Sequence, residues 1–178
     1  MVCLFYFKEI TMIIETLFGI EEVPAKTRSI KFRTIRPVFE TLTVKENVTN
    51  YINPKNRLTQ PSQIWELFRW LGRESKEYMI VLLMDGKNRI SAVDICSIGT
   101  LNQSLCHPRE IFKSALMASC AAIVLLHNHP SGCTDPSGED LAITRRLKEA
   151  SEIIGIRILD HLIVSETEYT SFVERGLL

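Results

Sequence analysis

The feature that most constrains the fold is an unbroken apolar run, Ala121–Leu126, that ends in two histidines. A short apolar run bounded by a turn is typical of a strand buried in the centre of a sheet. The residues that follow, Pro130–Gly132, predict a turn that reverses the chain. His127 and His129 lie two residues apart, so on an extended chain both side chains point to the same side. Asn128 between them is expected to point away.

A serine and a carboxylate follow the turn, at the start of a helix predicted over residues 137–154. Ser137 and Asp140 are three residues apart, so they share one face near the beginning of that helix. Two imidazoles and one carboxylate are the ligand set of a catalytic zinc, whose fourth position is left to water. We therefore predict one Zn²⁺ per chain, held by His127, His129 and Asp140. Ser137 would lie beside the open position.

Simpler interpretations of the same residues stay open. The Ser-x-x-Asp pattern is also a capping box, in which Ser137 and Asp140 only satisfy the backbone at a helix start. Histidines at the end of a strand can be ordinary hydrogen-bonded residues. Cys133 in the intervening turn is a further candidate ligand, although Asp140 is better placed as the third one. The joint pattern, with both halves at this spacing, is more specific than either half and favours the metal.

A hydrolytic zinc site also needs a base that takes a proton from water. Glu77 and Glu110 are the candidates in the upstream half of the chain. Glu77 opens the apolar segment 77–84, a predicted buried strand, which would fix it at a sheet edge close to the core. Glu110 falls in the first turn of a predicted helix, where a carboxylate is expected for the helix dipole alone. We therefore favour Glu77.

The order of the predicted elements indicates the fold class. Strands are predicted over 77–84, 89–98, 121–126 and 156–164, helices over 61–73, 108–119 and 137–154, and a short closing element over 169–178. This alternation predicts an α/β fold with a single mixed sheet flanked by helices. Residues 1–60 are predicted to form an N-terminal extension that is partly β, because segment 29–44 alternates, and residues 61–178 to form the main domain.

Charge and cysteine content restrict the partners and the compartment. Lys+Arg and Asp+Glu both number 21, so no protein-wide attraction to a polyanion is expected. The stretch 26–57 carries eight basic residues against two acidic ones, which favours a solvated surface and leaves a weak nucleic-acid contact open. Five irregularly spaced cysteines indicate reduced thiols and a cytoplasmic protein. No segment has the length of a membrane span, so no membrane association is expected.

Four blocks, in this order along the chain, resemble a known family. They are Ser97–Asn102, His107–Glu110, His127–Gly132 with Pro136-Ser137-x-x-Asp140, and Leu159–Val164. Over about residues 60–178 they resemble the JAMM (MPN+/JAB) metalloprotease motif in the form found in the RadC family. This resemblance implies the cytidine-deaminase-like α/β fold of JAB/MPN domains.

The resemblance also implies roles for individual residues. It implies a zinc ion held by His127, His129 and Asp140. It implies a water activated by a glutamate on an upstream strand, which maps best to Glu77, and an oxyanion stabilised by Ser137. Longer members of the family carry an N-terminal helix-hairpin-helix region with Gly-rich hairpins. The first 60 residues lack such hairpins, so the chain resembles a short form.

Three functional hypotheses follow. The first is a zinc-dependent metallopeptidase that cleaves a peptide or isopeptide bond in a peptide or protein substrate. The alternative is a DNA-associated, repair-related accessory protein that uses the basic N-terminal stretch and has a non-catalytic metal site. The third, an interaction scaffold without activity, is disfavoured because the ligand set is complete. Salt-dependent DNA affinity would separate the first two, because phosphate contacts weaken steeply with salt.

Overall fold

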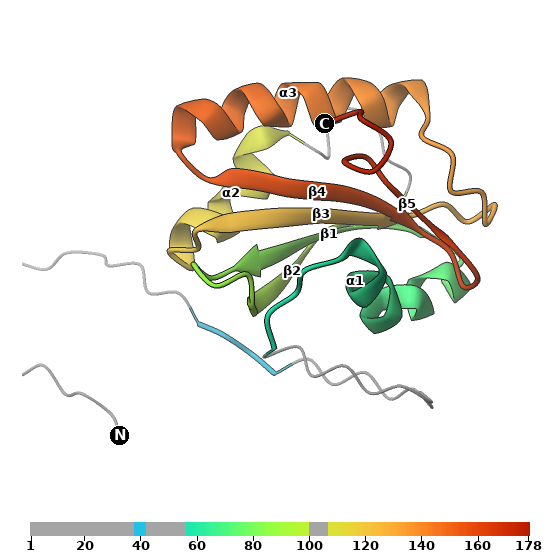
Figure 1. Ribbon diagram of the computed structural model, residues 1–178, viewed down its shortest axis with the longest axis horizontal. Coiled ribbons are helices and arrows are strands. Elements are labelled where there is room, and N and C mark those ends of the chain that lie inside the picture. Colours follow the sequence, from blue (N-terminus) through green and yellow to red (C-terminus); the bar gives the residue numbers. More distant parts are fainter. Residues whose placement is uncertain (1–37, 42–55, 100–106) are drawn as a thin grey trace, which may run out of the picture. The chain divides into compact units, whose positions relative to one another are not determined.

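The computed structural model describes residues 38–41, 56–99 and 107–178 (Figure 1). The chain divides into two compact units, 1–35 and 36–178, and every described residue belongs to the second. The alternating segment 29–44, predicted to be partly β, lies mostly outside the described residues. Its described part, 38–41, forms no regular element.

One mixed sheet of five strands forms the centre of the second unit. The strand order is β2-β1-β3-β4-β5. The strands are β1 (Glu77–Met84), β2 (Ile90–Gly99), β3 (Ala122–Asn128), β4 (Arg157–Val164) and β5 (Tyr169–Ser171). The pair β3–β4 is parallel and the other three pairs are antiparallel. The predicted single mixed sheet is therefore confirmed, and β3, the predicted central strand, is buried at every position.

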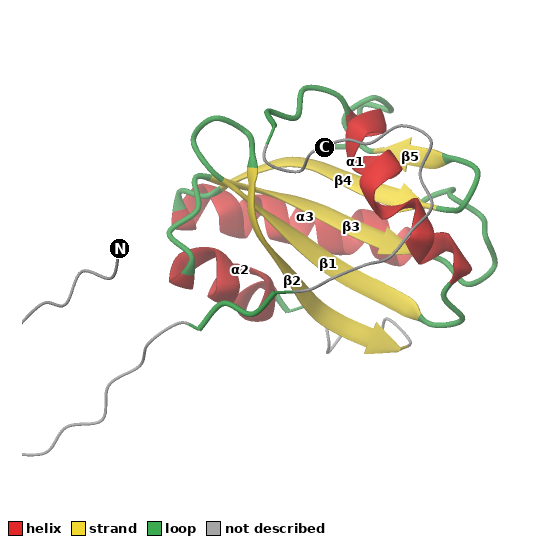
Figure 2. Ribbon diagram, turned by 90° about the horizontal axis from the view of Figure 1, so that it is seen from below, coloured by secondary structure: helices red, strands yellow, loops and turns green. Residues whose placement is uncertain are grey.

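Helices cover both faces of this sheet. Figures 1 and 2 show α2 (Pro108–Met117) and α3 (Gly138–Ile154) on one face and α1 (Pro61–Phe68) on the other. A 3-10 turn, Arg69–Arg73, continues α1. This three-layer arrangement confirms the α/β fold with flanking helices, and it is consistent with a JAB/MPN domain.

The sheet separates two apolar cores, and alternation along β3 decides which side chain joins which core. Val124 and Leu126 belong to the cluster that includes α1, whereas Ile123 and Leu125 belong to the cluster that includes α2 and α3. Because successive side chains on a strand point to opposite faces, His127 follows Leu125 towards the α2 and α3 side. The alternation of side chains along β3 therefore places His127 on the face of the sheet that α3 covers.

The observed strand limits differ from the predicted ones at the end that matters for the site. The apolar run predicts a strand over 121–126, but β3 continues to Asn128. His127 pairs with Met79 of β1, and Asn128 pairs with Val164 of β4. The predicted strand ended too early because a buried strand usually ends where polar residues begin. Here both are fully buried and have polar partners instead.

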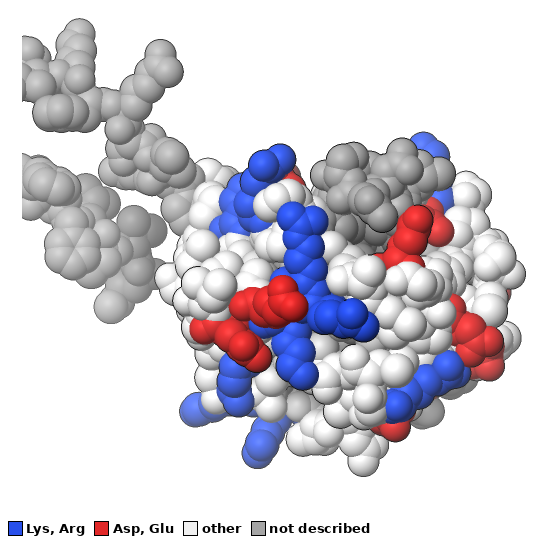
Figure 3. Space-filling model, turned by 90° about the horizontal axis from the view of Figure 1, so that it is seen from above, with Lys and Arg blue, Asp and Glu red and all other residues white. Residues whose placement is uncertain are grey.

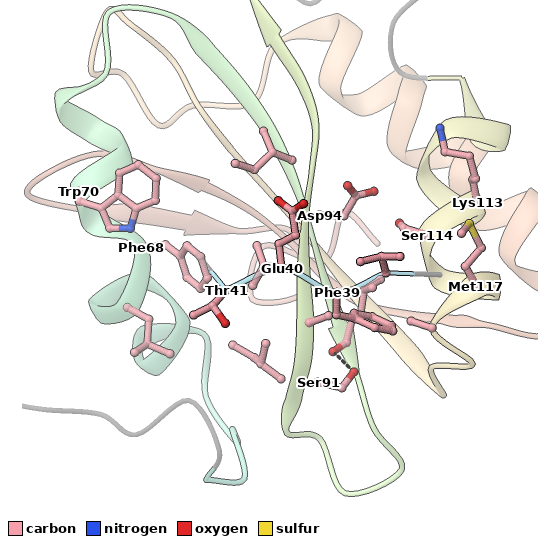
Figure 4. A pocket seen from close by; sticks show the side chains of 18 residues that line it. Phe39, Glu40, Thr41, Phe68, Trp70, Ser91, Asp94, Lys113, Ser114 and Met117 are labelled. Carbon is pink, nitrogen blue, oxygen red and sulfur yellow. Dashed lines mark hydrogen bonds between the residues drawn. The ribbon is translucent and has the colours of Figure 1, made fainter. Parts of the chain in front are cut away.

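Residues before α1 also pack on the domain. Leu58 is buried, and its backbone N–H donates to the carbonyl of Asn88 at 2.9 Å. The described segment 38–41 lines an open hollow of about 950 Å³ together with side chains of β2, α2 and the α1 region (Figure 4). Phe39 and Trp70 are among the lining side chains. In the part of the chain that the structure describes, no helix is long and apolar enough to cross a membrane.

Candidate metal centre

His127 lies near the end of β3, and its side chain is completely buried. Its Nε2 atom is 3.2 Å from Oδ1 of Asp140, which belongs to the first turn of α3. Its other ring nitrogen, Nδ1, is 2.8 Å from Nε2 of His161 on β4. The strand therefore presents one nitrogen of this imidazole to α3 and the other to its neighbouring strand.

His129 follows β3 and is the partly open member of the pair, with 14% of its side chain exposed. Its Nε2 is 3.3 Å from Oδ2 of Asp140 and 3.1 Å from Nε2 of His127. Its Nδ1 is 2.8 Å from the carbonyl oxygen of Cys133. Because a carbonyl only accepts, Nδ1 carries the proton of the neutral ring. The Nε2 lone pair is then left facing Asp140.

Asp140 is buried at the start of α3, and Ser137 is the residue that caps this helix. The Ser137 hydroxyl donates to Asp140 Oδ2 at 2.6 Å and accepts from the Asp140 backbone N–H at 3.1 Å. The backbone N–H of Ser137 also donates to Oδ2, at 2.8 Å. The Ser-x-x-Asp pattern thus forms a capping box and at the same time aims the carboxylate at the two histidines.

Electrostatics couples the carboxylate to both imidazoles. Burial alone would raise the pKa of the Asp140 carboxyl, but His127 and His129, which donate hydrogen bonds to it whenever Nε2 carries a proton, hold that pKa well below its usual range. The hydrogen bond that the protonated His129 ring donates to Asp140 is the largest cause that raises the pKa of His129 above its ordinary value. Asp140 is therefore ionised near neutral pH, as a metal ligand must be.

The three predicted ligands converge on one point. One ligand atom from each of His127, His129 and Asp140 lies within 4.8 Å of the others, so the group could hold a metal ion. Two imidazole nitrogens and one carboxylate oxygen suit zinc. Among the described residues this group does not include Cys133, whose exposed thiol lies 3.9 Å from Asp135 Oδ2. Asp140 is therefore the candidate for the third ligand, and its role stays a prediction.

Glu77 is the first residue of β1 and is half-buried. Met79 and Val81, two and four residues further along β1, belong to the core on the α2 and α3 side. By alternation Glu77 points to the same side as His127. Its negative charge is also among the causes that raise the pKa of His129, after that of Asp140. Both observations support the choice of Glu77 as the candidate base, which stays a prediction.

Glu110 has different surroundings. Its carboxylate pairs with Lys113 at 2.8 Å and with Arg109 at 3.4 Å, both on the same helix. The hydrogen bond to Lys113 is the main reason that the pKa of Glu110 is lowered. The described partners of the Glu110 carboxylate are therefore basic side chains of α2, not members of the metal group.

For His161 the sequence favours a place in the core or beside a ligand over direct catalysis. Its ring is fully buried, stacks on Phe172 with 4.5 Å between ring centroids, and touches His127. Burial holds the pKa of His161 well below its ordinary value. Thr144, which contacts His161, was missed. Its position one helical turn after Asp140 was the available signal.

Fold and site together define a class of protein: a three-layer α/β domain with a candidate His-His-Asp metal centre between the central strand and the start of a helix. The family model described as "RadC-like JAB domain" matches residues 58–177. The chain belongs to this family.

Relatives extend across bacteria and archaea. The chain is 56% identical to a UPF0758 protein of Pelobacter propionicus over 124 residues, which are 69% of this chain and 54% of the relative. It is 52% identical to a UPF0758 protein of Geobacter sulfurreducens, over 68% of this chain and 54% of that one. A UPF0758 protein of Methanosarcina mazei is 42% identical over 70% and 55% of the two chains. The chain thus spans about half the length of the curated relatives it matches.

Proposed function

We propose that this domain is a zinc-dependent hydrolase of the JAMM class that cleaves a peptide or isopeptide bond in a peptide or protein substrate. The observation that carries the proposal is the convergence of His127, His129 and Asp140, with Glu77 directed to the same side of the sheet. When bound there, the ion supplies Lewis-acid polarisation of a carbonyl and lowers the pKa of a water.

The chain's own residues supply the proton transfers. Glu77, as general base, accepts a proton from the attacking water on a carboxylate oxygen and passes it to the nitrogen of the leaving amine. Its half-buried position at the start of β1 keeps it close to the core and still in reach of solvent. The partial exposure of the His129 side chain, 14%, supports an approach of the substrate from the side of this residue.

Ser137 is proposed to donate a hydrogen bond to the oxyanion that forms during peptide cleavage. Its hydroxyl proton is directed at Asp140 Oδ2 in this structure. Donation to the oxyanion therefore requires the hydroxyl to rotate away from Asp140. The capping bond from the Asp140 backbone N–H to Ser137 Oγ holds the oxygen in place during that rotation.

The metal itself is tested first. Elemental analysis of the purified full chain should find one zinc per chain, and the double variant His127→Ala, His129→Ala should lose it. Full zinc retention in the double variant would contradict the assignment of the ligands.

The assignment of the general base is tested with the same substitution at two glutamates, Glu77 and Glu110. Glu77→Gln should keep zinc and melting temperature but abolish hydrolysis of a pooled library of fluorogenic peptides and isopeptide-linked substrates, because the amide cannot take the proton. Glu110→Gln is the control and should retain turnover. If Glu110→Gln abolishes turnover and Glu77→Gln does not, the base is wrongly assigned.

A further inference from the structure

Two buried polar residues outside the ligand group connect one ligand to another. Nδ1 of His127 lies 2.8 Å from Nε2 of His161, and Nδ1 of His161 lies 2.6 Å from Oγ1 of Thr144. Oγ1 of Thr144 in turn lies 2.6 Å from the backbone carbonyl oxygen of Asp140. The chain of contacts therefore starts at one ligand and ends at the backbone of another, and it crosses β3, β4 and α3.

The direction of each hydrogen bond in this chain follows from its last member. The carbonyl of Asp140 only accepts, so the Thr144 hydroxyl donates its single proton to it. Thr144 Oγ1 can then only accept from Nδ1–H of His161. A neutral His161 has its lone pair on Nε2, which accepts from Nδ1–H of His127. The remaining nitrogen of a neutral His127, Nε2, then carries a lone pair.

Burial makes this arrangement the favoured one. The side chains of His161 and Thr144 are almost completely shielded from water. A buried imidazolium without a carboxylate partner is costly, and the partners of the two His161 nitrogens are His127 and Thr144. A neutral His161 has one proton and one lone pair, which match what Thr144 and His127 require.

We propose that His161 and Thr144 are positioning residues that hold His127 in the tautomer whose Nε2 lone pair faces the metal site. The proposal rests on the metal centre proposed above. The same chain of bonds anchors the backbone of Asp140, so the orientations of a ligand on β3 and a ligand on α3 depend on each other. Partners of this kind fix the tautomer of a ligating histidine and raise its basicity.

His161 also stacks on Phe172, so the test must separate packing from hydrogen bonding. His161→Phe keeps an aromatic ring in that space but removes the acceptor for His127. His161→Gln can place an amide oxygen near the position of Nε2 and so restores the acceptor. Thr144→Val removes the hydroxyl with little change of volume, and Thr144→Ser restores it.

The readout is the affinity of the full chain for Zn²⁺ alone, measured by competition with a chelating dye, beside the melting temperature of the metal-free protein. His161→Phe should weaken zinc binding by about 10- to 100-fold, the usual effect of removing such a partner. His161→Gln and Thr144→Ser should stay within about threefold of the parent, whereas Thr144→Val should weaken binding by up to about tenfold. Ser151→Ala is the control, because Ser151 donates to a carbonyl of the same helix, that of Lys148, and should leave affinity unchanged.

A second measurement does not depend on any variant folding. Long-range proton–nitrogen NMR of the zinc-loaded parent should show His161 protonated on Nδ1 and not on Nε2. Protonation of His161 on Nε2 would overturn the proposal. So would parental zinc affinity in both His161→Phe and Thr144→Val, or equal losses in His161→Phe and His161→Gln at equal melting temperature. A parent chain that binds no zinc would instead overturn the proposed metal centre, and this inference with it.

Discussion

Asn128 accepts a hydrogen bond from the backbone N–H of Tyr78, at 2.9 Å, across the pair formed by β1 and β3. The amide nitrogen of Asn128 donates to the carbonyl of Lys76 at 3.0 Å. The two backbone groups flank Glu77, so one buried side chain holds the backbone on either side of the proposed base. Of three consecutive residues, His127 and His129 are thus candidate ligands on one face, and Asn128 between them holds the strand that carries the proposed base.

Replacing Asn128 with alanine should separate the base from the metal. The variant removes both hydrogen bonds, so the free energy of unfolding in urea should fall by about 1–3 kcal/mol. Turnover should fall because the backbone at Glu77 loses its anchor. Zinc affinity should stay within about threefold of the parent value, because the Asn128 side chain hydrogen-bonds to Tyr78 and Lys76 and not to a proposed ligand. A loss of zinc affinity as large as that of His161→Phe would show that Asn128 supports the ligands instead.

The sequence was sufficient to predict which residues meet when they are close along the chain. His127 and His129 share a face because side chains two apart on an extended chain point the same way, and Ser137 and Asp140 meet because they are three residues apart at a helix start. The apolar segment that begins at Glu77 was likewise enough to predict β1 with its observed limits.

Contacts between elements could not be predicted in this way, because they depend on strand register. His161 reaches His127 because β4 runs parallel to β3 with Leu125 paired to His161, an alignment that no local pattern reveals. The partner of Asn128 depends equally on the pairing of β1 with β3. The supporting residues of the site therefore emerged only from the structure.

Ser137→Ala should have two separable effects. Loss of the helix cap should cost about 1 kcal/mol of stability, which is read as a lower melting temperature. Loss of an oxyanion donor should lower turnover by about 10²- to 10³-fold. Ser137→Thr, which keeps the hydroxyl, should recover most of both. A lower melting temperature with unchanged turnover would leave Ser137 with the capping role alone.

Gly72 is required by close approach of two backbones. A Cβ at this position would overlap the backbone nitrogen of Glu166 and come within 2.8 Å of Cα of Ser165. The same turn is held by Trp65, whose indole N–H donates to the carbonyl of Ser165 at 3.0 Å. Gly72→Ala should therefore lower the free energy of unfolding by about 1–3 kcal/mol, measured in urea. The control is Gly86→Ala, where an added Cβ meets nothing within 4 Å, and equal losses in the two variants would contradict the steric explanation.

Asp160 should make stability depend on pH. Burial raises the pKa of its carboxyl above the ordinary 3.8, although it accepts hydrogen bonds from the N–H groups of His161 and Val173 and from the Ser171 hydroxyl. A raised folded-state pKa means that the native state binds the proton more tightly than the unfolded state. This contribution to stability is fully present below pH 3.8 and is lost as the pH rises through the folded-state pKa.

The test is Asp160→Asn, which cannot ionise. The melting temperature of the variant minus that of the parent should increase as the pH rises from 3.8 towards neutrality. Replacing the carboxyl by an amide adds an offset that does not depend on pH. A difference that is flat, or that moves the other way, would show that burial of the charge is not the controlling effect.

Removal of residues 1–57 addresses the alternative function. All eight basic residues of the stretch 26–57 are deleted, whereas the metal group and the family match, 58–177, are kept. Zinc content should remain one per chain, and the melting temperature should fall because segment 38–41 no longer lines the hollow beside β2.

The same truncation tests nucleic-acid binding. The α3 side of the domain carries acidic and basic side chains intermixed, so this face offers no surface of one sign to a phosphate backbone (Figure 3). In a gel-shift titration we therefore expect the full chain to bind duplex DNA weakly, to lose it between low and physiological salt, and to lose it entirely on truncation. Tight binding that survives physiological salt in the full chain and disappears in the truncated one would overturn this expectation. It would favour a DNA-associated role for the basic stretch, with the metal centre serving a domain that is recruited to DNA.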